Sequence, residues 1–442
     1  MIERKEYARR RRRVIEELGD DCVAIIPTAP VRRRNRDIEY RFRPDSDFFY
    51  LTGFPEPRAV AVLVPGRPQG EYLLFCEDRE ADAVALHGPV AGPEGAVSRY
   101  GADDAFPITD MDEILPGLME RSSRLYYSLG SYTDFDHRVF GWMHDLRRRS
   151  RHLAGPGEVV ALNHILHDMR LIKSAAELRA IGKAIEATEH GHRRAMAAAR
   201  PGVGEALLEA ELRYGFAEKG CRHTAYPCIV ASGANGCVMH YIDNEGVLSE
   251  GDLVLVDAGA ESAFYAADVT RTFPVSGRFT DTQKALYELV LEAQQAGIEA
   301  ARIGADVNAP HRAAVAIIAR GLLNLGLLEG SYRDVMRTEA FRQYYMHPST
   351  HWLGLDVHDV GDYKFEGEWR ELEAGMVLTV EPGIYIGADA AVPVEWRGTA
   401  IRIEDDILVT RDGPEVLSAS LGKSVADVEA MVGASASAAT GG

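Results

Sequence analysis

The sequence predicts an α/β protein, in the broad sense that includes α+β, built from two domains. The chain has 442 residues, which is more than one ordinary hydrophobic core accommodates. Its 46% hydrophobic and 26% charged residues are typical of a folded globular protein. Short apolar runs alternate along the chain with segments of helical periodicity, so both strands and helices are expected in each domain.

The N-terminal domain is expected to cover residues 1–170 and to begin with a helix. An unbroken run of arginines at 9–13 lies among glutamates, which predicts a solvated amphipathic helix rather than a targeting signal. Short apolar runs bounded by turn-forming or polar residues follow, as expected for the strands of an α/β domain. These runs are 22–28, 59–65, 71–76 and 124–130.

The second domain, expected over residues 171–432, begins with a long helix. Ser174 is followed three residues later by Glu177, which is the spacing of a capping box, and Ala and Glu are abundant in the residues that follow. A Pro-Gly pair at 201–202 ends the helical pattern. The last residues, 433–442, are of low complexity and are expected to form a disordered tail.

The second domain also contains an internal repeat, which predicts a pseudo-two-fold arrangement. Residues 250–259 and 374–383 share the order Gly, apolar strand, acid, one further residue, Gly, so that Asp257 matches Glu381. Each copy is followed by another apolar strand with a second acid. These second acids are Asp268 and Glu404. Each half therefore brings two carboxylates on consecutive strands.

The acids are expected to face one side of the strands. If a hairpin turn is centred within residues 262–263, Asp257 pairs with Asp268, and their Cβ atoms lie roughly 4.5 to 5.5 Å apart. Two carboxylates at that separation repel, so either one binds a proton or cations coordinate both. In the later strand, alternation places Arg402 and Glu404 on the same side.

Three histidines, His347, His351 and His358, lie in a segment interrupted by Pro and Gly. The interruptions argue against a continuous helix, and a loop leading into a strand at 355–360 is expected. Imidazole is a common metal ligand and also titrates near neutral pH, so the cluster indicates either a metal site or acid–base chemistry. With the carboxylates of the repeat, two divalent ions suit this donor set better than one structural zinc. Mn²⁺ is favoured, with Co²⁺ and Zn²⁺ as alternatives.

The composition also restricts partners and compartment. Acidic residues outnumber basic ones by 67 to 49, giving a net charge of −18, which disfavours nucleic acid as a partner. No stretch has the ~20 apolar residues that a membrane span requires, and no signal peptide is expected. The 5 cysteines are odd in number and form no CxxC pair, so a reducing cytoplasm is the expected location.

The acids and His351, in their sequence context, resemble the dinuclear metal site of the pita-bread metallopeptidases. The matching segments are "VDAG" with Asp257, "ADVTRTF" with Asp268, "HWLGLDVHDVG" with His351, "VEPGIY" with Glu381 and "IRIEDD" with Glu404. Nearly the whole chain resembles the proline-specific aminopeptidase P group of that family, including "DSDFFYLTGFPEP" at 45–57. The resemblance implies a creatinase-like α/β domain followed by a catalytic pita-bread domain.

The resemblance implies an aminopeptidase that hydrolyses the N-terminal Xaa-Pro bond of peptides. Two divalent ions would be held by the five ligands, with Asp257 and Glu404 contacting both, and a hydroxide between the ions would attack the peptide bond. Glu381 would also carry a proton to the leaving proline nitrogen. His240 and His358 would hold the substrate carbonyl and the tetrahedral intermediate.

A pocket for the proline ring and an oligomer are implied in the same way. His347 and Tyr226 would line the pocket, with Arg402 as a further candidate. In a dimer or tetramer, Asp37 would close the active site of a neighbouring subunit; the alternative interpretation of Asp37 is a loop acid among arginines. Two rival functions remain. They are a prolidase, which cuts only Xaa-Pro dipeptides and shares the metal site, and a metal-free binding protein of the same fold.

Overall fold

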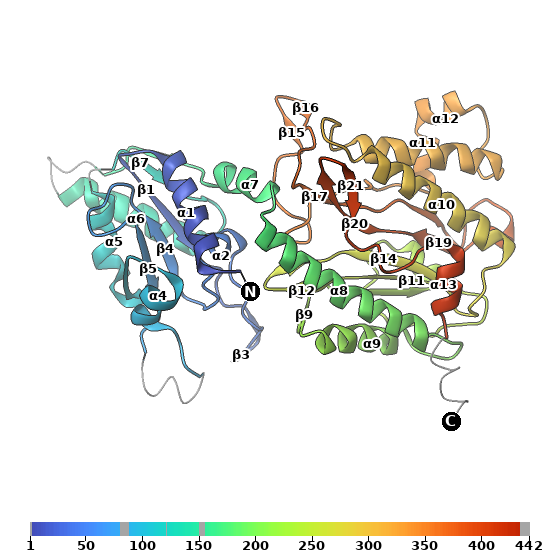
Figure 1. The fold of residues 1–442 in the computed structure, drawn as a ribbon, viewed down its shortest axis with the longest axis horizontal. Helices are drawn as coiled ribbons and strands as arrows, with labels where there is room; N and C mark the ends of the chain where they lie inside the picture. Colours follow the sequence, from blue (N-terminus) through green and yellow to red (C-terminus); the bar gives the residue numbers. More distant parts are fainter. Residues whose placement is uncertain (1, 80–87, 121, 150–154, 434–442) are drawn as a thin grey trace. The chain divides into compact units, whose positions relative to one another are not determined.

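The computed structural model describes residues 2–79, 88–120, 122–149 and 155–433 (Figure 1). The chain divides into two compact units, Met1–Met169 and Arg170–Gly442. Apart from Gly433, the tail predicted at 433–442 lies outside the described residues. In the described ranges no helix is both long and apolar enough to cross a membrane.

The N-terminal unit is built on a mixed six-stranded sheet. Its strands are β1 (Cys22–Pro27), β4 (Val60–Leu63), β5 (Tyr72–Cys76), β6 (Asp104–Pro107), β7 (Arg124–Tyr126) and β8 (Glu158–Val160). They lie in the order β6-β5-β4-β1-β7-β8, and β1 pairs antiparallel with β4 but parallel with β7. Every residue of β1, β4 and β5 is buried, which explains why apolar runs predicted these strands correctly.

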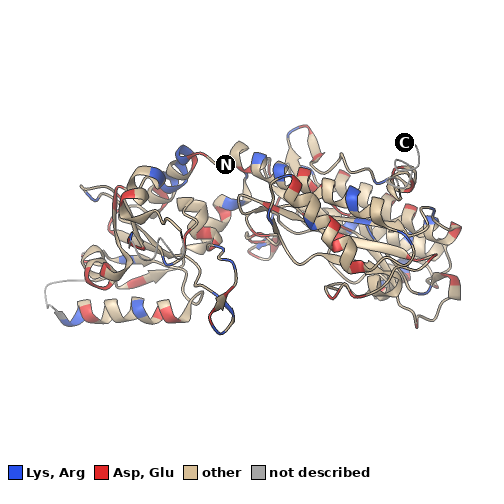
Figure 2. Cartoon of the chain, turned by 90° about the horizontal axis from the view of Figure 1, so that it is seen from below, with Lys and Arg blue, Asp and Glu red and all other residues tan. Residues whose placement is uncertain are grey.

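Helices and one short hairpin complete this unit. The helices are α1 (Arg4–Leu18), α2 (Ser46–Thr52), α4 (Gly92–Tyr100), α5 (Met111–Met119), α6 (Thr133–Arg149) and α7 (Asn163–Leu171), the last of which crosses the boundary between the two units. The hairpin consists of β2 (Arg33–Asn35) and β3 (Ile38–Glu39), whose residues are exposed. In the view of Figure 2, acidic and basic residues are interspersed along the ribbons of both units.

Helix α1 confirms the predicted N-terminal amphipathic helix, and two of its arginines lie on the buried face. Arg10 and Arg11 are only 2% and 5% exposed. The Nη1 atoms of Arg10 and Arg11 donate to the carbonyls of Tyr50 (3.0 Å) and Leu51 (2.8 Å), and the Arg11 guanidinium lies over the Tyr72 ring. The arginine run is therefore not uniformly exposed, and carbonyl acceptors and an aromatic face compensate for the burial of these two arginines.

The C-terminal unit consists of two similar halves, each with a helix pair followed by antiparallel strands. The helices are α8 (Ala175–Ala198), α9 (Glu205–Glu218), α10 (Asp281–Ala300), α11 (Ala309–Asn324), α12 (Tyr332–Thr338) and α13 (Val425–Met431). Helix α8 packs against α9, and α10 packs against α11. The predicted capping box at the start of α8 is confirmed, since Ser174 and Glu177 exchange both hydrogen bonds.

Each half of the C-terminal unit contains a three-stranded antiparallel sheet. The strands of this unit are β9 (His223–Thr224), β10 (Ile229–Ser232), β11 (Leu253–Ala258), β12 (Ala260–Ser262), β13 (Tyr265–Ala266), β14 (Val269–Pro274), β15 (Lys364–Phe365), β16 (Glu368–Trp369), β17 (Val377–Val380), β18 (Gly383–Ile386), β19 (Thr399–Arg402), β20 (Asp405–Thr410) and β21 (Gly413–Val416). The two sheets have the orders β10-β11-β14 and β17-β20-β21. Gly251 and Gly375 precede the matching strands with φ of 91° and 94°. In Figure 1 the strands of these two sheets lie between α8 and α9 on one side and α10 and α11 on the other.

The hairpin between Asp257 and Asp268 has a different register from the predicted one. Strands β11 and β14 pair so that Asp257 lies opposite Thr270. The turn is formed by Ala263 and Phe264, which have φ of 50° and 67°. Positive φ at both positions is typical of a type I′ turn, for which Asn-Gly is the usual sequence, so Ala-Phe gave no signal. The predicted register was wrong by two residues, a shift that preserves which face each side chain occupies.

The segment after His351 is a loop and not the strand predicted at 355–360. Its backbone turns back, with the Asp359 N–H donating to the Trp352 carbonyl at 2.9 Å. The buried Asp359 carboxylate binds the cations of Arg170 (2.5 Å) and Lys173 (3.1 Å). These contacts favour a folded-back loop over an extended chain, so the strand prediction is wrong although its alternating pattern suggested a sheet face.

Candidate active site

Acids from both halves of the C-terminal unit meet at the ends of its strands. Asp257 lies near the end of β11, and Asp268 directly precedes β14. Glu381 directly follows β17, and Glu404 lies between β19 and β20, where the structure divides a segment predicted as one strand. His351 joins them through the second sheet, since its N–H donates to Thr379 Oγ1 at 3.2 Å. The two halves thus contribute matching acids, as the repeat predicts.

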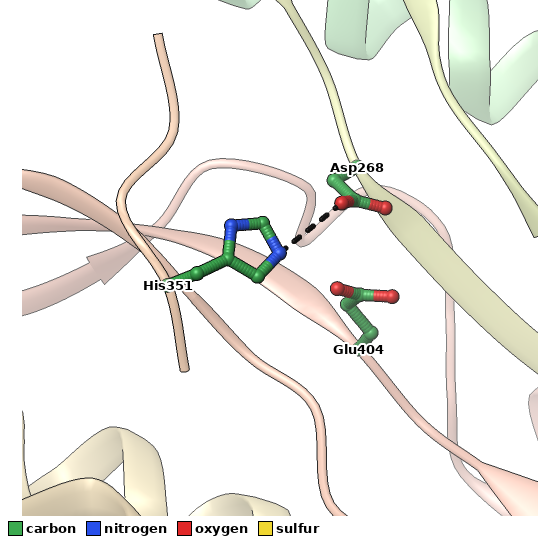
Figure 3. Close-up of side chains that lie close together, drawn as sticks. All are labelled: Asp268, His351 and Glu404. Carbon is green, nitrogen blue, oxygen red and sulfur yellow. Dashed lines mark ion pairs between the residues drawn. The ribbon is translucent and has the colours of Figure 1, made fainter. Parts of the chain in front are cut away.

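Three of these residues could hold a metal ion as they stand. Among the described residues, Asp268, His351 and Glu404 each offer a ligand atom within 4.8 Å of the others (Figure 3). His351 Nε2 lies 3.4 Å from Asp268 Oδ2 and 3.4 Å from Glu381 Oε1. Asp257 and Glu381 are outside this group of three, and Glu381 adjoins it through His351.

Asp257 is connected to the group by hydrogen bonds from two further side chains. The Tyr226 hydroxyl donates to Asp257 Oδ1 at 2.6 Å and also contacts Asp268. Arg402 Nη2 donates to Asp257 Oδ2 at 2.5 Å. Tyr226 and Arg402, predicted from the sequence as pocket residues, therefore lie directly on the acids.

The acids lie close together in a buried site, so burial and mutual repulsion destabilise their ionised forms. Burial raises the pKa of Asp268 and Glu404, and it raises the pKa of Glu381 to about 7. Burial alone would lower the pKa of His351, but the contact with Asp268 and the charge of Glu381 raise it to about 9. Divalent cations would relieve the same repulsion that protons relieve here, so the donor set fits such ions.

A second cluster beside the acids is built around Tyr385 of β18. His347 Nδ1 lies 2.6 Å from the Pro348 carbonyl, which assigns the ring proton to Nδ1. His347 Nε2 then accepts from the Tyr385 hydroxyl at 2.9 Å, and that hydroxyl accepts from Arg402 Nη1 at 2.9 Å. Burial, together with the Arg402 charge, lowers the pKa of His347 to about 3. His347 is therefore neutral and held in one orientation.

His358 and His240, predicted to work on the substrate, both have exposed side chains. The His358 ring lies edge-on to the His351 ring, with centroids 4.4 Å apart. Burial and the charge of His351 lower the pKa of His358, and His240 is close enough to lower it further. The structure thus brings both histidines near the acids. Asp37 belongs to the N-terminal unit, where it is exposed in the turn between β2 and β3.

The sequence interpretation missed two threonines that orient the acids. Thr270 Oγ1 donates to Glu404 Oε2 at 2.5 Å, and Thr379 Oγ1 donates to Glu381 Oε1 at 3.3 Å. Each threonine lies two residues from an acid of the site along a strand, Thr270 after Asp268 and Thr379 before Glu381. The two-residue period of side chains along a strand could have identified both of them.

Comparison with protein families now identifies the unit that contains these acids. Residues 179–411, more than half of the chain, match the model of metallopeptidase family M24. The chain belongs to family M24. Residues 7–126 match the model of the aminopeptidase P N-terminal domain. The M24 match covers all of the acids, and the family confirms the predicted α/β fold with an aminopeptidase P domain before a pita-bread domain.

Individual M24 relatives are similar over nearly the whole chain. The Xaa-Pro aminopeptidase of Escherichia coli (strain K12) is 41% identical over 433 residues, which cover 98% of each chain. Xaa-Pro aminopeptidase 3 of Rattus norvegicus is 34% identical, over 96% of this chain and 85% of its own. The structure of Pseudomonas aeruginosa aminopeptidase PepP superimposes with a TM-score of 0.97 at 50% identity, covering 99% of this chain and 100% of that chain. Zn-substituted E. coli aminopeptidase P in complex with product gives 0.95 at 41% identity, covering 98% and 99%.

Proposed function

We propose that this M24 metallopeptidase is an aminopeptidase that hydrolyses the N-terminal Xaa-Pro bond of peptides. The observation that supports this most directly is the convergence of acids from both halves with His351 in an M24 chain. The full-length similarity to the Xaa-Pro aminopeptidase of E. coli supports the substrate class. The prolidase interpretation is not favoured, and the presence of all five candidate metal donors in the sequence argues against a metal-free binding protein.

Two divalent ions would be bound by the acids of the site and one histidine, and Mn²⁺ is the proposed metal, with Co²⁺ and Zn²⁺ as alternatives. The proposed ligands are Asp257, Asp268, His351, Glu381 and Glu404. Carboxylate oxygens with a single imidazole suit Mn²⁺ better than the sulfur-rich ligand sets of structural zinc sites. When bound, the ions would supply a water of lowered pKa as the nucleophile.

The remaining side chains would bind the substrate and move its protons. Glu381, whose pKa is raised to about 7, can take up a proton near neutral pH and release it to the leaving proline nitrogen. His240 and His358 would donate to the scissile carbonyl and to the oxyanion that develops from it. The neutral ring of His347, with Tyr226 and Arg402, would line the proline pocket.

The N-terminal unit would serve substrate selection and assembly. We propose a dimer or tetramer in which Asp37 of one subunit contributes to the active site of another. The chain would act in the cytoplasm, in keeping with five free cysteines among the described residues. Its partners are then peptides with proline in second position, and neither nucleic acid nor a membrane is a proposed partner.

A comparison of four substrates tests the proposed activity. They are a tripeptide Xaa-Pro-Yaa, a longer Xaa-Pro peptide, the dipeptide Xaa-Pro, and a tripeptide with Ala in place of Pro. An aminopeptidase must leave space beyond the proline, so contacts with the third residue should raise kcat/KM above that of the dipeptide. The Ala tripeptide should be cut poorly. A preference for the dipeptide would support a prolidase, and equal rates on Pro and Ala substrates would exclude proline specificity.

A further inference from the structure

Glu205, at the start of helix α9, is a buried carboxylate that the proposed mechanism does not use. Its side chain is fully buried, with 0% exposure. Among the described residues, the groups that donate hydrogen bonds to it lie within residues 232–246, the segment that contains His240. The donors are the Ser232 N–H (2.7 Å), the Ser232 hydroxyl (2.7 Å), the Asn235 amide (3.1 Å), the Tyr241 hydroxyl (2.8 Å) and the Gly246 N–H (2.7 Å). Glu205 thus connects both ends and the middle of this segment.

The His240 side chain is exposed, so the backbone of this segment determines where it lies. After the 3-10 turn at Gly233–Cys237, the side chains alternate. Cys237, Met239 and Tyr241 pack against a small apolar cluster. Val238 and Ile242 are more than half exposed. Tyr241, the neighbour of His240, therefore points inward, and its hydroxyl is held by Glu205.

The backbone around Glu205 is shaped to fit the carboxylate. A Cβ atom on Gly246 would lie 2.7 Å from the Glu205 carboxylate, so a larger residue would displace the carboxylate. The Glu205 N–H also donates to the Gly246 carbonyl at 2.9 Å. Ser232 is paired with Val254 of β11, the strand that contains Asp257. One carboxylate therefore joins the His240 segment to a strand of the acidic site.

We propose that Glu205 is a positioning residue that holds His240 at the active site by way of Tyr241. The inference rests on the proposed function, in which His240 contacts the substrate. A neutral amide cannot replace the carboxylate, since Oε1 and Oε2 each accept from at least two donors. Whichever way a glutamine is turned, its NH₂ group faces hydrogen-bond donors and leaves the main-chain N–H of either Ser232 or Gly246 without this acceptor.

The test compares Glu205→Gln with Glu211→Gln, the same chemical change on the same helix. Glu211 binds Arg194 at 2.7 Å, and both side chains are about one-third exposed, at 30% and 33%. Each change is made in the wild-type chain and in a His240→Ala background, and kcat/KM is measured on Xaa-Pro-Yaa together with metal content. Glu205→Gln should lower kcat/KM about tenfold or more in the wild-type chain. In the His240→Ala background its effect should be within about twofold, because the group it positions is absent.

A second variant and a second measurement separate a positioning role from general damage. Tyr241→Phe removes only the hydroxyl that Glu205 holds, and it should show the same dependence on His240 with a smaller loss. Amide hydrogen exchange of residues 233–246 should rise in Glu205→Gln while β11 keeps its protection. Equal losses with and without His240, or unchanged exchange in 233–246, would overturn the proposal. Failure of the wild-type enzyme to cleave Xaa-Pro-Yaa would refute the proposed function instead. The hydrogen-exchange measurement would still test whether Glu205 holds residues 233–246 in place.

Discussion

Asp359→Asn is expected to destabilise the C-terminal unit strongly, although Asp359 is not one of the proposed ligands. The Asp359 carboxylate lies between Arg170 and Lys173, and the exposed fractions of the three side chains are 1%, 3% and 1%. Burial alone would raise the pKa of Asp359, but the two cations hold it below its usual value. Asparagine keeps the shape of the side chain and removes the charge that both cations need.

The size of the effect follows from the burial of all three groups. Removing one partner of a buried ion pair costs about 3 to 5 kcal/mol, because a charge is left without compensation. For a unit of this size, about 2 °C of Tm corresponds to 1 kcal/mol, so Tm should fall by roughly 6 to 10 °C. A carboxyl group whose pKa is lowered by folding stabilises the folded state at pH values above its pKa in the unfolded chain, which is about 3.9 for Asp. This contribution is lost as the pH falls through the pKa of the same group in the folded protein. The difference from wild type should therefore be complete at neutral pH and shrink in acid.

The difference in Tm between Asp359→Asn and the wild type is measured by thermal unfolding of metal-loaded protein, followed by circular dichroism at neutral and acidic pH. Asp356→Asn is the matched control, because Asp356 also binds Arg170, at 2.7 Å, but its side chain is 36% exposed. It should cost about 1 kcal/mol or less. The kcat of Asp359→Asn should also fall, since the change lies next to His358. Equal Tm shifts for the two variants, or an unchanged Tm for Asp359→Asn at neutral pH, would refute the reasoning.

Three further predictions concern the acids and histidines of the site. EDTA should abolish peptidase activity and Mn²⁺ should restore it better than Mg²⁺ because the donors include an imidazole; full activity after metal removal would contradict this. Metal-free protein should lose stability as the pH rises from about 4.5 to about 9, because folding raises the pKa of Glu381 from 4.5 to about 7 and that of His351 from 6.5 to about 9; thermal unfolding across this range tests the direction, and a rising Tm would oppose it. Asp257→Ala should lose metal, whereas His358→Ala should keep it while kcat falls roughly 10²-fold. Metal content and kcat are measured for both variants, and the assigned roles are wrong if the two variants behave alike.

The repeated acids could be predicted from the sequence because their signal is local. A buried strand must be apolar, so an acid at the end of "LVLVD" or "MVLTVE" is conspicuous, and two copies with equivalent glycines make coincidence improbable. The histidine cluster was also conspicuous, because its three histidines lie close together in the sequence. The register between Asp257 and Asp268 was predicted less well, because an Ala-Phe turn with positive φ has no sequence signature.

The buried charge pairs could not be predicted, because their partners are far apart in the sequence and each charge, taken alone, resembles a surface residue. Arg271 has 0% exposure and donates to the Glu404 carbonyl at 2.7 Å and to the Asp405 carboxylate at 2.8 Å. In the sequence it is simply an arginine in a strand, and strand periodicity says which face it occupies but not which acid it meets. The same holds for Glu205, which at the start of a helix is expected to interact with the helix dipole. Local patterns therefore place the reacting groups, whereas the groups that hold them in position become visible only when distant segments are brought together.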